Sequence, residues 1–267
     1  MPSLNIHYLI NYDEEKIEIS DVKCNELHQS IEKIDLILSE IDYCIILRDN
    51  LMDTFNDFTS NGPGAENNFN RLNRYMMNWL NSFYAWIGFH ERHYKKLFSN
   101  LKTKYYDTYF EYRFAYAMRK FTTHQAVCVR RTTFDVLKET TRFEIPIEDI
   151  LKYSKEMKKS FVEELSPLKD TCEFIDLEKF TKGFFTMFEL LQNEFWNAII
   201  PQTDIECEKL CSYITPYIDK PISRYYLIDS NGDEKNIDTI INHYREKKQM
   251  LTLSDDMRKY LLLSNDK

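Results

Sequence analysis

The sequence predicts a mainly α protein, a helical bundle with small β-strand appendages, and three observations support that prediction. The 267-residue chain has only 5 Gly and 7 Pro, so few positions force it to turn. Its 43% hydrophobic and 15% aromatic content is enough for a large core. Between residues 21 and 58 apolar side chains recur mostly at steps of three and four, as on one face of a helix. This composition excludes a disordered chain, a collagen and an enzyme with a Gly-rich phosphate loop.

The first three helices follow from local patterns. The amphipathic helix over 21–58 is expected to stop at Thr59-Ser-Asn-Gly-Pro-Gly64, which combines several turn-forming residues. A second helix is expected over 66–99 and a third over 102–121, and both segments are rich in aromatic residues. Together these helices form the predicted bundle.

The second half of the chain adds strands. Residues 127–134 and 140–145 are rich in β-branched side chains and predict two short strands. Pro201 is expected to end a helix that starts near residue 176, because proline lacks the backbone N–H. The other expected elements are a hairpin over 4–19 with an acidic turn at 13–15, a helix over 147–165, a helix over 176–199, a strand over 224–233 and a last helix over 238–249.

No internal repeat or linker divides the sequence, so residues 1–267 are expected to form one domain. Within it we expect an N-terminal hairpin in 1–20, a helical core over 21–200, and a C-terminal extension over 201–267 with a short strand and helix. No run approaches the roughly 20 apolar residues of a membrane span, and the first residues lack the features of a signal peptide. The six cysteines are scattered, as is typical of a reducing compartment. These features predict a cytoplasmic protein with no membrane partner.

Charge is unevenly distributed along the chain. The formal net charge is −8, which excludes a protein that coats nucleic acid indiscriminately. Residues 71–142, however, carry 14 Lys and Arg against five acids, or +9, which leaves −17 on the rest. The positive segment either attracts an anionic partner at a confined site or pairs with acidic helices of the same chain or of a second copy.

The expected third helix has two different faces. At 100° per residue, one stripe consists of apolar residues: Phe110, Phe114, Ala117, Met118 and Phe121. The opposite side carries four tyrosines, with Arg119 beside them: Tyr105, Tyr109, Tyr112 and Tyr116. Tyrosine rings have much apolar area and a hydroxyl that needs a partner. The tyrosine side is therefore expected to contact either other helices of the bundle or another subunit.

Arg119 is followed five residues later by His124. In a continuous helix, five residues turn through about 140°, so the two side chains converge only if the helix ends between them. Thr122 and Thr123, followed by a β-like segment, suggest such an ending. An arginine binds phosphate oxygens through a fixed fork of donors, and an imidazole exchanges a proton near neutral pH. Attack of a ribose 2′-hydroxyl on its own phosphate requires both functions, without a metal.

The segment Tyr112-Arg-Phe-Ala-Tyr-Ala-Met-Arg-Lys-Phe-Thr-Thr-His124 resembles the signature helix of the HEPN superfamily (higher eukaryotes and prokaryotes nucleotide-binding domain). Its members are all-helical, and many are metal-independent ribonucleases of toxin–antitoxin, abortive-infection and antiviral systems. They act as homodimers whose Arg/His pairs meet across the two-fold axis. The resemblance implies that Arg119 binds and polarises the scissile phosphate and that His124 acts as general base or acid. Lys120 stands where the family more often has Asn, Asp or His.

Further residues are candidates for contacts with the substrate. Arg130 and Arg131 are adjacent in an expected strand, so they point to opposite faces and one of them can reach a phosphate. Asn78 interrupts an apolar helix, where it either makes a hydrogen bond between helices or lines the pocket beside Arg119. The complete set of substrate-binding candidates is Lys120, Arg113, Tyr116, Arg130, Arg131 and Asn78.

Two spacings have the geometry of partial metal sites. His90 and His93 are three residues apart on a helix, and Cys207 and Cys211 are four apart. The histidine motif is one residue short of the His-Glu-x-x-His spacing of metalloproteases, which favours histidines on a helix surface. No second Cys or His pair lies near Cys207 and Cys211 in sequence, which favours a buried or incidental pair. We expect no metal and no cofactor.

These observations predict a metal-independent endoribonuclease of a bacterial toxin or antiviral-defence type, which cleaves RNA with Arg119 and His124 at a homodimer interface. An antitoxin or a defence-system protein is an expected further partner. The alternative is a catalytically inactive helical protein that holds a protein partner or a nucleotide, or serves as a scaffold.

Overall fold

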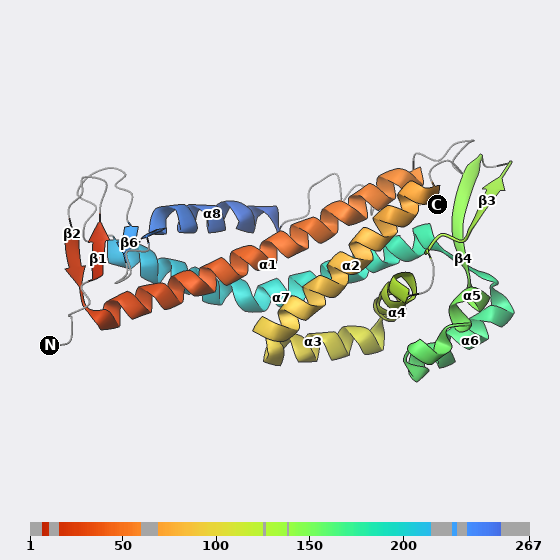
Figure 1. Cartoon of the computed structure of the whole chain (residues 1–267), viewed down its shortest axis with the longest axis horizontal. Coiled ribbons are helices and arrows are strands. Elements are labelled where there is room, and N and C mark those ends of the chain that lie inside the picture. Colours follow the sequence, from red (N-terminus) through yellow and green to blue (C-terminus); the bar gives the residue numbers. More distant parts are fainter. Residues whose placement is uncertain are drawn as a thin grey trace. The chain divides into compact units, whose positions relative to one another are not determined.

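The computed structural model shows a mainly α protein with small antiparallel strand pairs, as predicted (Figure 1). The structure describes residues 7–10, 16–59, 69–124, 127–137, 139–214, 226–228 and 234–251. The chain divides into two compact units. The first consists of residues 1–42 and 196–255, and the second is built on residues 43–195. The expected single domain over residues 1–267 stays a prediction.

The first unit combines a sheet with parts of three helices. The sheet has the order β2-β1-β6-β7, and all its neighbours are antiparallel. Its strands are β1 (His7–Ile10), β2 (Lys16–Ile19), β6 (Tyr226–Ile228) and β7 (Glu234–Asn236). The β1–β2 pairing, with His7 opposite Ile19, confirms the strands of the expected N-terminal hairpin, whose acidic turn lies outside the described residues.

The helices of the first unit are α8 (Ile237–Met250), the first part of α1 (Asp21–Thr59) and the last part of α7 (Leu177–Ile214). Asn236 caps α8 by accepting a hydrogen bond from the Thr239 N–H at 2.8 Å. Tyr244 of α8 is buried and donates to Asp204 of α7 at 3.0 Å. The expected last helix over 238–249 is therefore confirmed.

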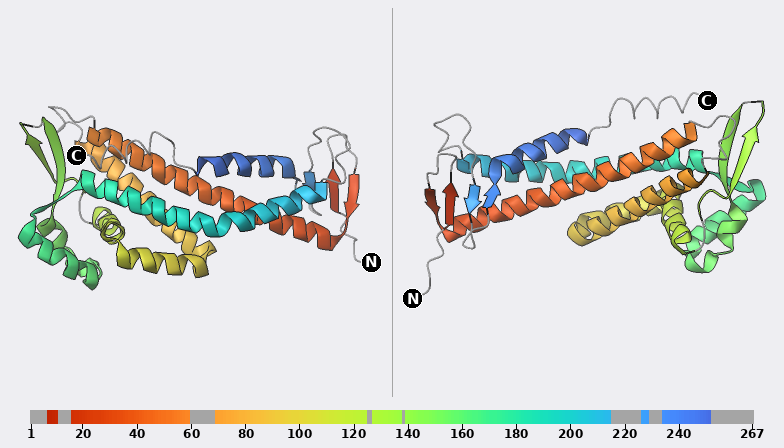
Figure 2. Two further views of the ribbon diagram at one scale, coloured as in Figure 1. Left: turned by 180° about the vertical axis from the view of Figure 1, so that it is seen from behind. Right: turned by 45° about the horizontal axis from the view of Figure 1, so that its top comes forward.

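The second unit contains the aromatic core. Its elements are the rest of α1, α2 (Phe69–His93), α3 (Lys95–Thr108), α4 (Phe110–His124), β3 (Arg131–Asp135), β4 (Thr140–Pro146), α5 (Ile147–Leu151), a 3₁₀ helix η2 (Ser154–Glu156), α6 (Lys159–Thr171), β5 (Phe174–Asp176) and the first part of α7 (Figure 2). Trp79, Phe83 and Trp86 of α2 are fully buried against Phe184 and Phe188 of α7. Edge-to-face contacts of this kind add to the stabilisation from buried area.

The small sheet of the second unit has the order β3-β4-β5. Strand β4 confirms the strand predicted over 140–145, and Arg131 lies opposite Glu144 in the register. The strand predicted over 127–134 is present but begins only at Arg131, so Arg130 lies outside it. Strand β5 is three residues long and was not predicted.

Three expected helices are interrupted in the structure. The helix expected over 147–165 is divided into α5 and α6, with the 3₁₀ helix η2 between them. The other two break at tyrosines. The second helix does not continue to residue 99, because Tyr94 leaves the helical conformation (φ −125°, ψ 34°) and α3 starts anew. The third helix does not run unbroken over 102–121, because Tyr109 is extended (φ −109°, ψ 122°) and separates α3 from α4. Both breaks let a new helix return its own apolar face to the core, as Phe98 and Phe114 show by being fully buried.

The predicted end of a helix at Pro201 was also wrong. Helix α7 runs from Leu177 to Ile214 with Pro201 inside it. A proline removes one backbone hydrogen bond, but buried side chains on both flanks, Ile199 and Leu210 among them, hold the helix in place across it.

Candidate functional site on helix α4

Helix α4 places one face in the core and another at the surface. Phe114, Met118 and Phe121 are buried, as the apolar stripe predicted. The expected tyrosine side is divided, because Tyr105 belongs to α3 and Tyr109 lies in the break. Tyr105 and Tyr112 are both buried within the same unit. Contacts within the chain therefore cover much of the tyrosine side, which was expected to contact either other helices or another subunit.

Arg119 lies half-buried near the end of α4. Its guanidinium carbon is 3.9 Å from the ring centroid of Tyr84 of α2, which is a close cation–π contact. Its Nε is buried and has no hydrogen-bond partner in the part of the chain that the structure describes. Within those same residues no carboxylate lies at ion-pair distance from it. Arg119 therefore presents a donor group whose charge no described acid neutralises, which suits an anionic ligand.

Lys120 and Tyr116 extend this group. The Lys120 ammonium is 5.8 Å from the ring centroid of Tyr116, and the rings of Tyr116 and Tyr84 are 5.9 Å apart. We call Tyr84, Tyr116, Arg119 and Lys120 the α4 cluster. Two cations, each beside a partly accessible ring, form a surface that suits phosphates and stacked bases. Sequence reasoning missed Tyr84, although an aromatic residue on the polar side of the second helix was a usable signal.

A shallow pocket lies beside the α4 cluster. It is lined by Tyr106, Arg113, Tyr116, Ala117, Lys120, Met157, Lys158 and Phe161. The Lys158 ammonium lies 4.0 Å from the ring centroid of Tyr106. The pocket thus brings Lys120 and Lys158 to the same side of α4, and both contribute positive charge there.

Arg113 reaches this pocket, but its charge is neutralised. Its Nε and Nη2 donate to the two carboxylate oxygens of Glu164 of α6 at 2.7 and 2.6 Å. Its Nη1 donates to the carbonyls of Tyr106 and Asp107, the latter at 3.0 Å. The hydrogen bond to Glu164 raises the pKa of Arg113. Arg113 therefore fastens the break between α3 and α4 to α6, which leaves it little capacity for substrate.

The structure places the remaining candidates elsewhere. Arg130 pairs with Asp149 at 3.4 Å. Arg131 pairs with Glu144 at 3.8 Å and lies 4.2 Å from the ring centroid of Phe174. Asn78 is exposed on α2, and its carbonyl accepts a hydrogen bond from Ser82.

No hydrogen bond, ion pair or ring contact among the described residues joins Arg130, Arg131 or Asn78 to Arg119. Ser82 also accepts from Asn50 of α1 at 2.9 Å, so this part of α2 holds helices together.

His124 is the last residue of α4, and its side chain lies outside the described residues. The expectation that the helix ends between Arg119 and His124 was wrong. The hydroxyls of Thr122 and Thr123 both donate to the Arg119 carbonyl, at 3.1 and 2.8 Å, and the helix continues past them. Positions 119 and 124 therefore leave one helix about 140° apart in direction and about 7.5 Å apart along its axis.

The chain beyond α4 is held against α2 by Asn73. Its side-chain carbonyl accepts from the Val129 N–H at 2.7 Å, and its amide donates to the Val129 carbonyl at 3.3 Å. Asn73 and Val129 are buried, so the two bonds form in a place from which water is largely excluded. The neighbouring Cys128 is fully buried as well, and burial raises the pKa of its thiol. Asn73 was not predicted, but a polar residue inside an apolar stripe is the signal that identifies it.

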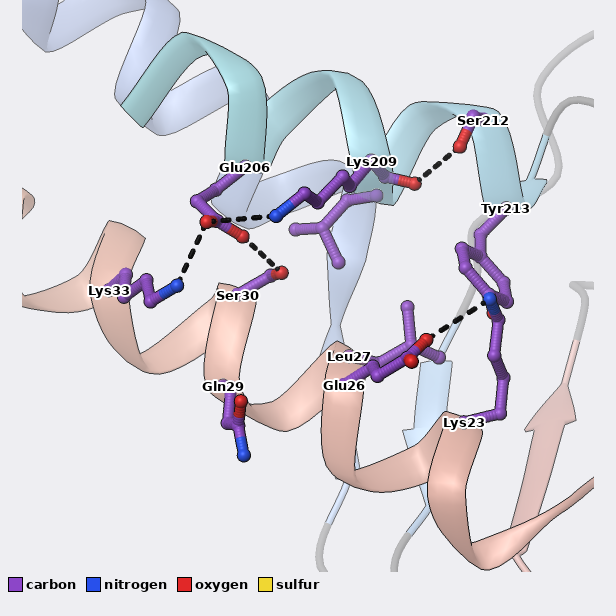
Figure 3. A pocket seen from close by; sticks show the side chains of 11 residues that line it. Lys23, Glu26, Leu27, Gln29, Ser30, Lys33, Glu206, Lys209, Ser212 and Tyr213 are labelled. Atoms are coloured by element: carbon purple, nitrogen blue, oxygen red, sulfur yellow. Dashed lines mark hydrogen bonds and ion pairs between the residues drawn. The ribbon is translucent and has the colours of Figure 1, made fainter. Parts of the chain in front are cut away.

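A second pocket lies in the first unit, between the start of α1 and the end of α7 (Figure 3). It has a volume of about 390 Å³. At one end of it Glu206 of α7 points toward α1 and accepts from Ser30, Lys33 and Lys209 at 2.7, 2.8 and 3.1 Å. Burial acts to raise the pKa of Glu206, but these three hydrogen bonds outweigh it and lower the pKa to about 2.

The other end of this pocket is closed by Lys23 and Tyr213. The Lys23 ammonium lies 3.3 Å from the centroid of the Tyr213 ring and 3.3 Å from Glu26 (Figure 3). Every lysine that lines the pocket thus faces an acid of the same pocket. These residues form an ion-pair network between α1 and α7, and their charges are already compensated.

Comparison with protein-family models, with functionally described proteins and with solved structures finds no match for this chain. In the described ranges, no three His, Cys, Asp or Glu side chains are grouped so that they could hold a metal ion. Over the same ranges, no helix is both long and apolar enough to cross a bilayer.

Proposed function

We propose that this protein is a metal-independent endoribonuclease of a bacterial toxin or antiviral-defence type, which acts in the cytoplasm as a homodimer. The observation that supports the proposal is the state of Arg119. Its guanidinium is held over Tyr84 at 3.9 Å, its Nε is buried without a partner, and no described carboxylate neutralises it. A buried donor without an acceptor costs about 1–3 kcal/mol, which an arriving phosphate oxygen recovers.

The chemistry assigns one role to each residue of the pair. Arg119 binds the non-bridging oxygens of the scissile phosphate and stabilises the charge that builds up on them. His124 accepts the proton of the ribose 2′-hydroxyl, whose oxygen attacks the phosphorus. The bond to the 5′-oxygen breaks, and that oxygen takes up a proton. The products are one strand with a 2′,3′-cyclic phosphate and one with a 5′-hydroxyl.

The continuous α4 explains why the proposal includes a second copy. Within one chain, positions 119 and 124 project about 140° apart. A two-fold axis beside α4 instead brings Arg119 of one copy toward His124 of the other, and repeats the arrangement on the other side. In this arrangement the α4 cluster of each copy binds the RNA strand that the pair cleaves.

The first experiment is an RNA cleavage assay in the presence of EDTA, with the end groups identified. We expect cyclic phosphate and 5′-hydroxyl ends, and a loss of at least about 100-fold in cleavage for Arg119→Ala and His124→Ala. Arg92→Ala is the matched control, because it removes the same charge from an exposed position of α2 in the same positive segment. Cleavage that persists in both active-site variants, or that requires a metal, would refute the proposal.

A mixing experiment tests the composite site. When Arg119→Ala and His124→Ala chains are combined, half of the dimers are mixed and each has one intact site, so activity returns to about a quarter of wild type. A site within one chain gives no recovery. The control is either variant alone at twice the concentration, which stays inactive.

A binding protein without catalysis is the second candidate. The continuous α4 favours it, because positions 119 and 124 project about 140° apart from one helix. In that case Arg119→Ala weakens RNA binding in a filter assay, whereas His124→Ala leaves it unchanged and no cleavage is detected. An antitoxin or a defence-system protein is a further partner that the same cluster could hold, and co-purification in the native host tests it.

A further inference from the structure

Strand β3 is the outer strand of its sheet (Figure 1). Strand β4 pairs with it along one edge, and within the described ranges no strand pairs with the other edge. An edge strand presents a row of backbone N–H and C=O groups that can pair with another strand. Proteins usually block such an edge with a proline, a bulge or inward-pointing charges, and β3 contains no proline.

The end of β3 and the turn that follows it are also unusually apolar for a surface. Phe134 is 42% exposed, Val136 75% and Leu137 97%. Single exposed apolar side chains are ordinary, but three among four consecutive residues beside an open strand edge mark a contact surface. Phe134 belongs to β3, whereas Val136 and Leu137 belong to the turn after it, so a strand that pairs with the open edge of β3 lies beside this apolar group.

The charge pattern of β3 identifies the partner as a second copy of this chain. The strand reads Arg131-Thr-Thr-Phe-Asp135, with opposite charges at its two ends. If two copies pair antiparallel about Thr133, Arg131 of each faces Asp135 of the other. A parallel pairing would instead put like charges side by side, which is unfavourable.

The side chains already present support this register. Residues 131, 133 and 135 share one face of the sheet, because side chains alternate along a strand. On that face Arg131 has Glu144 of β4 on one side, at 3.8 Å. Its side chain is 50% exposed, and its guanidinium carbon also lies 4.2 Å from the ring centroid of Phe174 of β5, so Arg131 turns from there toward the open edge when Asp135 of a second copy approaches.

We propose that β3 pairs antiparallel with β3 of a second copy, centred on Thr133, so that two three-stranded sheets join into one sheet of six strands. The proposal extends the homodimer of the proposed function and in that respect rests on it. The pairing of β3 is tested by measuring the molecular mass of the protein without RNA, whereas the proposed function is tested by RNA cleavage. The failure of one proposal can therefore be distinguished from the failure of the other.

Charge reversal with rescue provides the test. Arg131→Asp and Asp135→Arg each place like charges together at both ends of the paired strands, and each is expected to weaken the dimer at least about ten-fold by analytical ultracentrifugation. The double variant Arg131→Asp/Asp135→Arg restores opposite charges across the paired strands but places an aspartate beside Glu144 of β4, so it is expected to dimerise more tightly than either single variant and less tightly than wild type. Arg142→Asp is the control, because it reverses an exposed charge on β4 and leaves the open edge unchanged.

A crosslink tests the register even if a charge variant folds poorly. At the two-fold axis, residue 133 faces itself, and facing strand residues lie within disulfide distance. Thr133→Cys is therefore expected to form a covalent dimer under mild oxidation, whereas wild type and Arg142→Cys stay monomeric on a non-reducing gel. Wild-type protein that stays monomeric at 100 µM, a double variant that fails to recover, or crosslinking that is equal at positions 133 and 142 would overturn the proposal.

Discussion

Glu206→Gln provides a direct test of the ion-pair network in the first unit. The change keeps the size of the side chain and removes the charge that Lys33 and Lys209 surround at 2.8 and 3.1 Å. A glutamine in this place still accepts a hydrogen bond from Ser30, so the variant isolates the contribution of the charge. We expect a folded protein of lower stability.

The magnitude follows from the pKa of Glu206. A shift from 4.5 to about 2 corresponds to at most about 3 kcal/mol of stabilisation at neutral pH. The side chains of Lys33 and Lys209 are 59% and 58% exposed, so solvent screens part of the attraction. The expected loss on Glu206→Gln at pH 7 is therefore about 1–2 kcal/mol.

The pH dependence has a definite sign. The pKa of Glu206 is lower in the folded state, so the stabilisation is complete above the unfolded value near 4.5 and disappears as the pH falls from there toward 2. Urea unfolding of wild type and Glu206→Gln at pH 7, 5 and 3.5 should give a difference that is constant between the first two and smaller at the third. Glu208→Gln is the control, because Glu208 is exposed on the same helix. The reasoning fails if wild type and variant differ equally at all three pH values, or are equally stable at pH 7.

Three further predictions concern the second unit. Arg48→Met leaves the buried carboxylate of Glu189 unpaired and should lower the free energy of unfolding in urea by about 3–5 kcal/mol. The loss should be smaller at pH 5 than at pH 8, because burial raises the pKa of Glu189. The double variant with Glu189→Leu should recover most of the loss, and no recovery would contradict the explanation. Asn73→Ala should lower the free energy of unfolding by about 2 kcal/mol and speed amide hydrogen exchange at Val129. Unchanged exchange would show that the two hydrogen bonds of Asn73 do not hold the chain at Val129. Gln192→Leu should raise the free energy of unfolding by about 1 kcal/mol, and with it the thermal midpoint, because neither amide atom of this buried side chain has a hydrogen-bond partner among the described residues. A lower midpoint would indicate such a partner.

The sequence was sufficient to predict elements that depend on local patterns. The long first helix, the β3–β4 strands and the last helix each show a clear period or a run of β-branched residues. The breaks at Tyr94 and Tyr109 were not predictable in this way, because tertiary packing decides where a helix bends back to the core. Helix α7 shows the opposite case, since packing on both flanks carries it through Pro201.

In the candidate site too, local patterns predicted some residues, and residues that depend on distant contacts were missed. Arg119 was identified from its position on an amphipathic helix and from the resemblance of its segment to a known motif. Tyr84 and Asn73 were missed because each acts on a residue more than thirty positions away, which no local pattern reveals. The continuation of α4 to residue 124 was missed because the threonines that suggested its end bond back to the Arg119 carbonyl and keep the helix intact.

Helix α2 carries both Tyr84, beneath the Arg119 guanidinium, and Asn73, which fastens the chain beyond residue 124. The two contacts are about 16 Å apart along one rigid rod. A shift of α2 along its axis therefore carries the support of the cation and the anchor of the following segment in the same direction and by the same amount. A protein or ligand that binds the exposed side of α2 and shifts this helix thus moves the ring under the Arg119 guanidinium without contacting Arg119 itself.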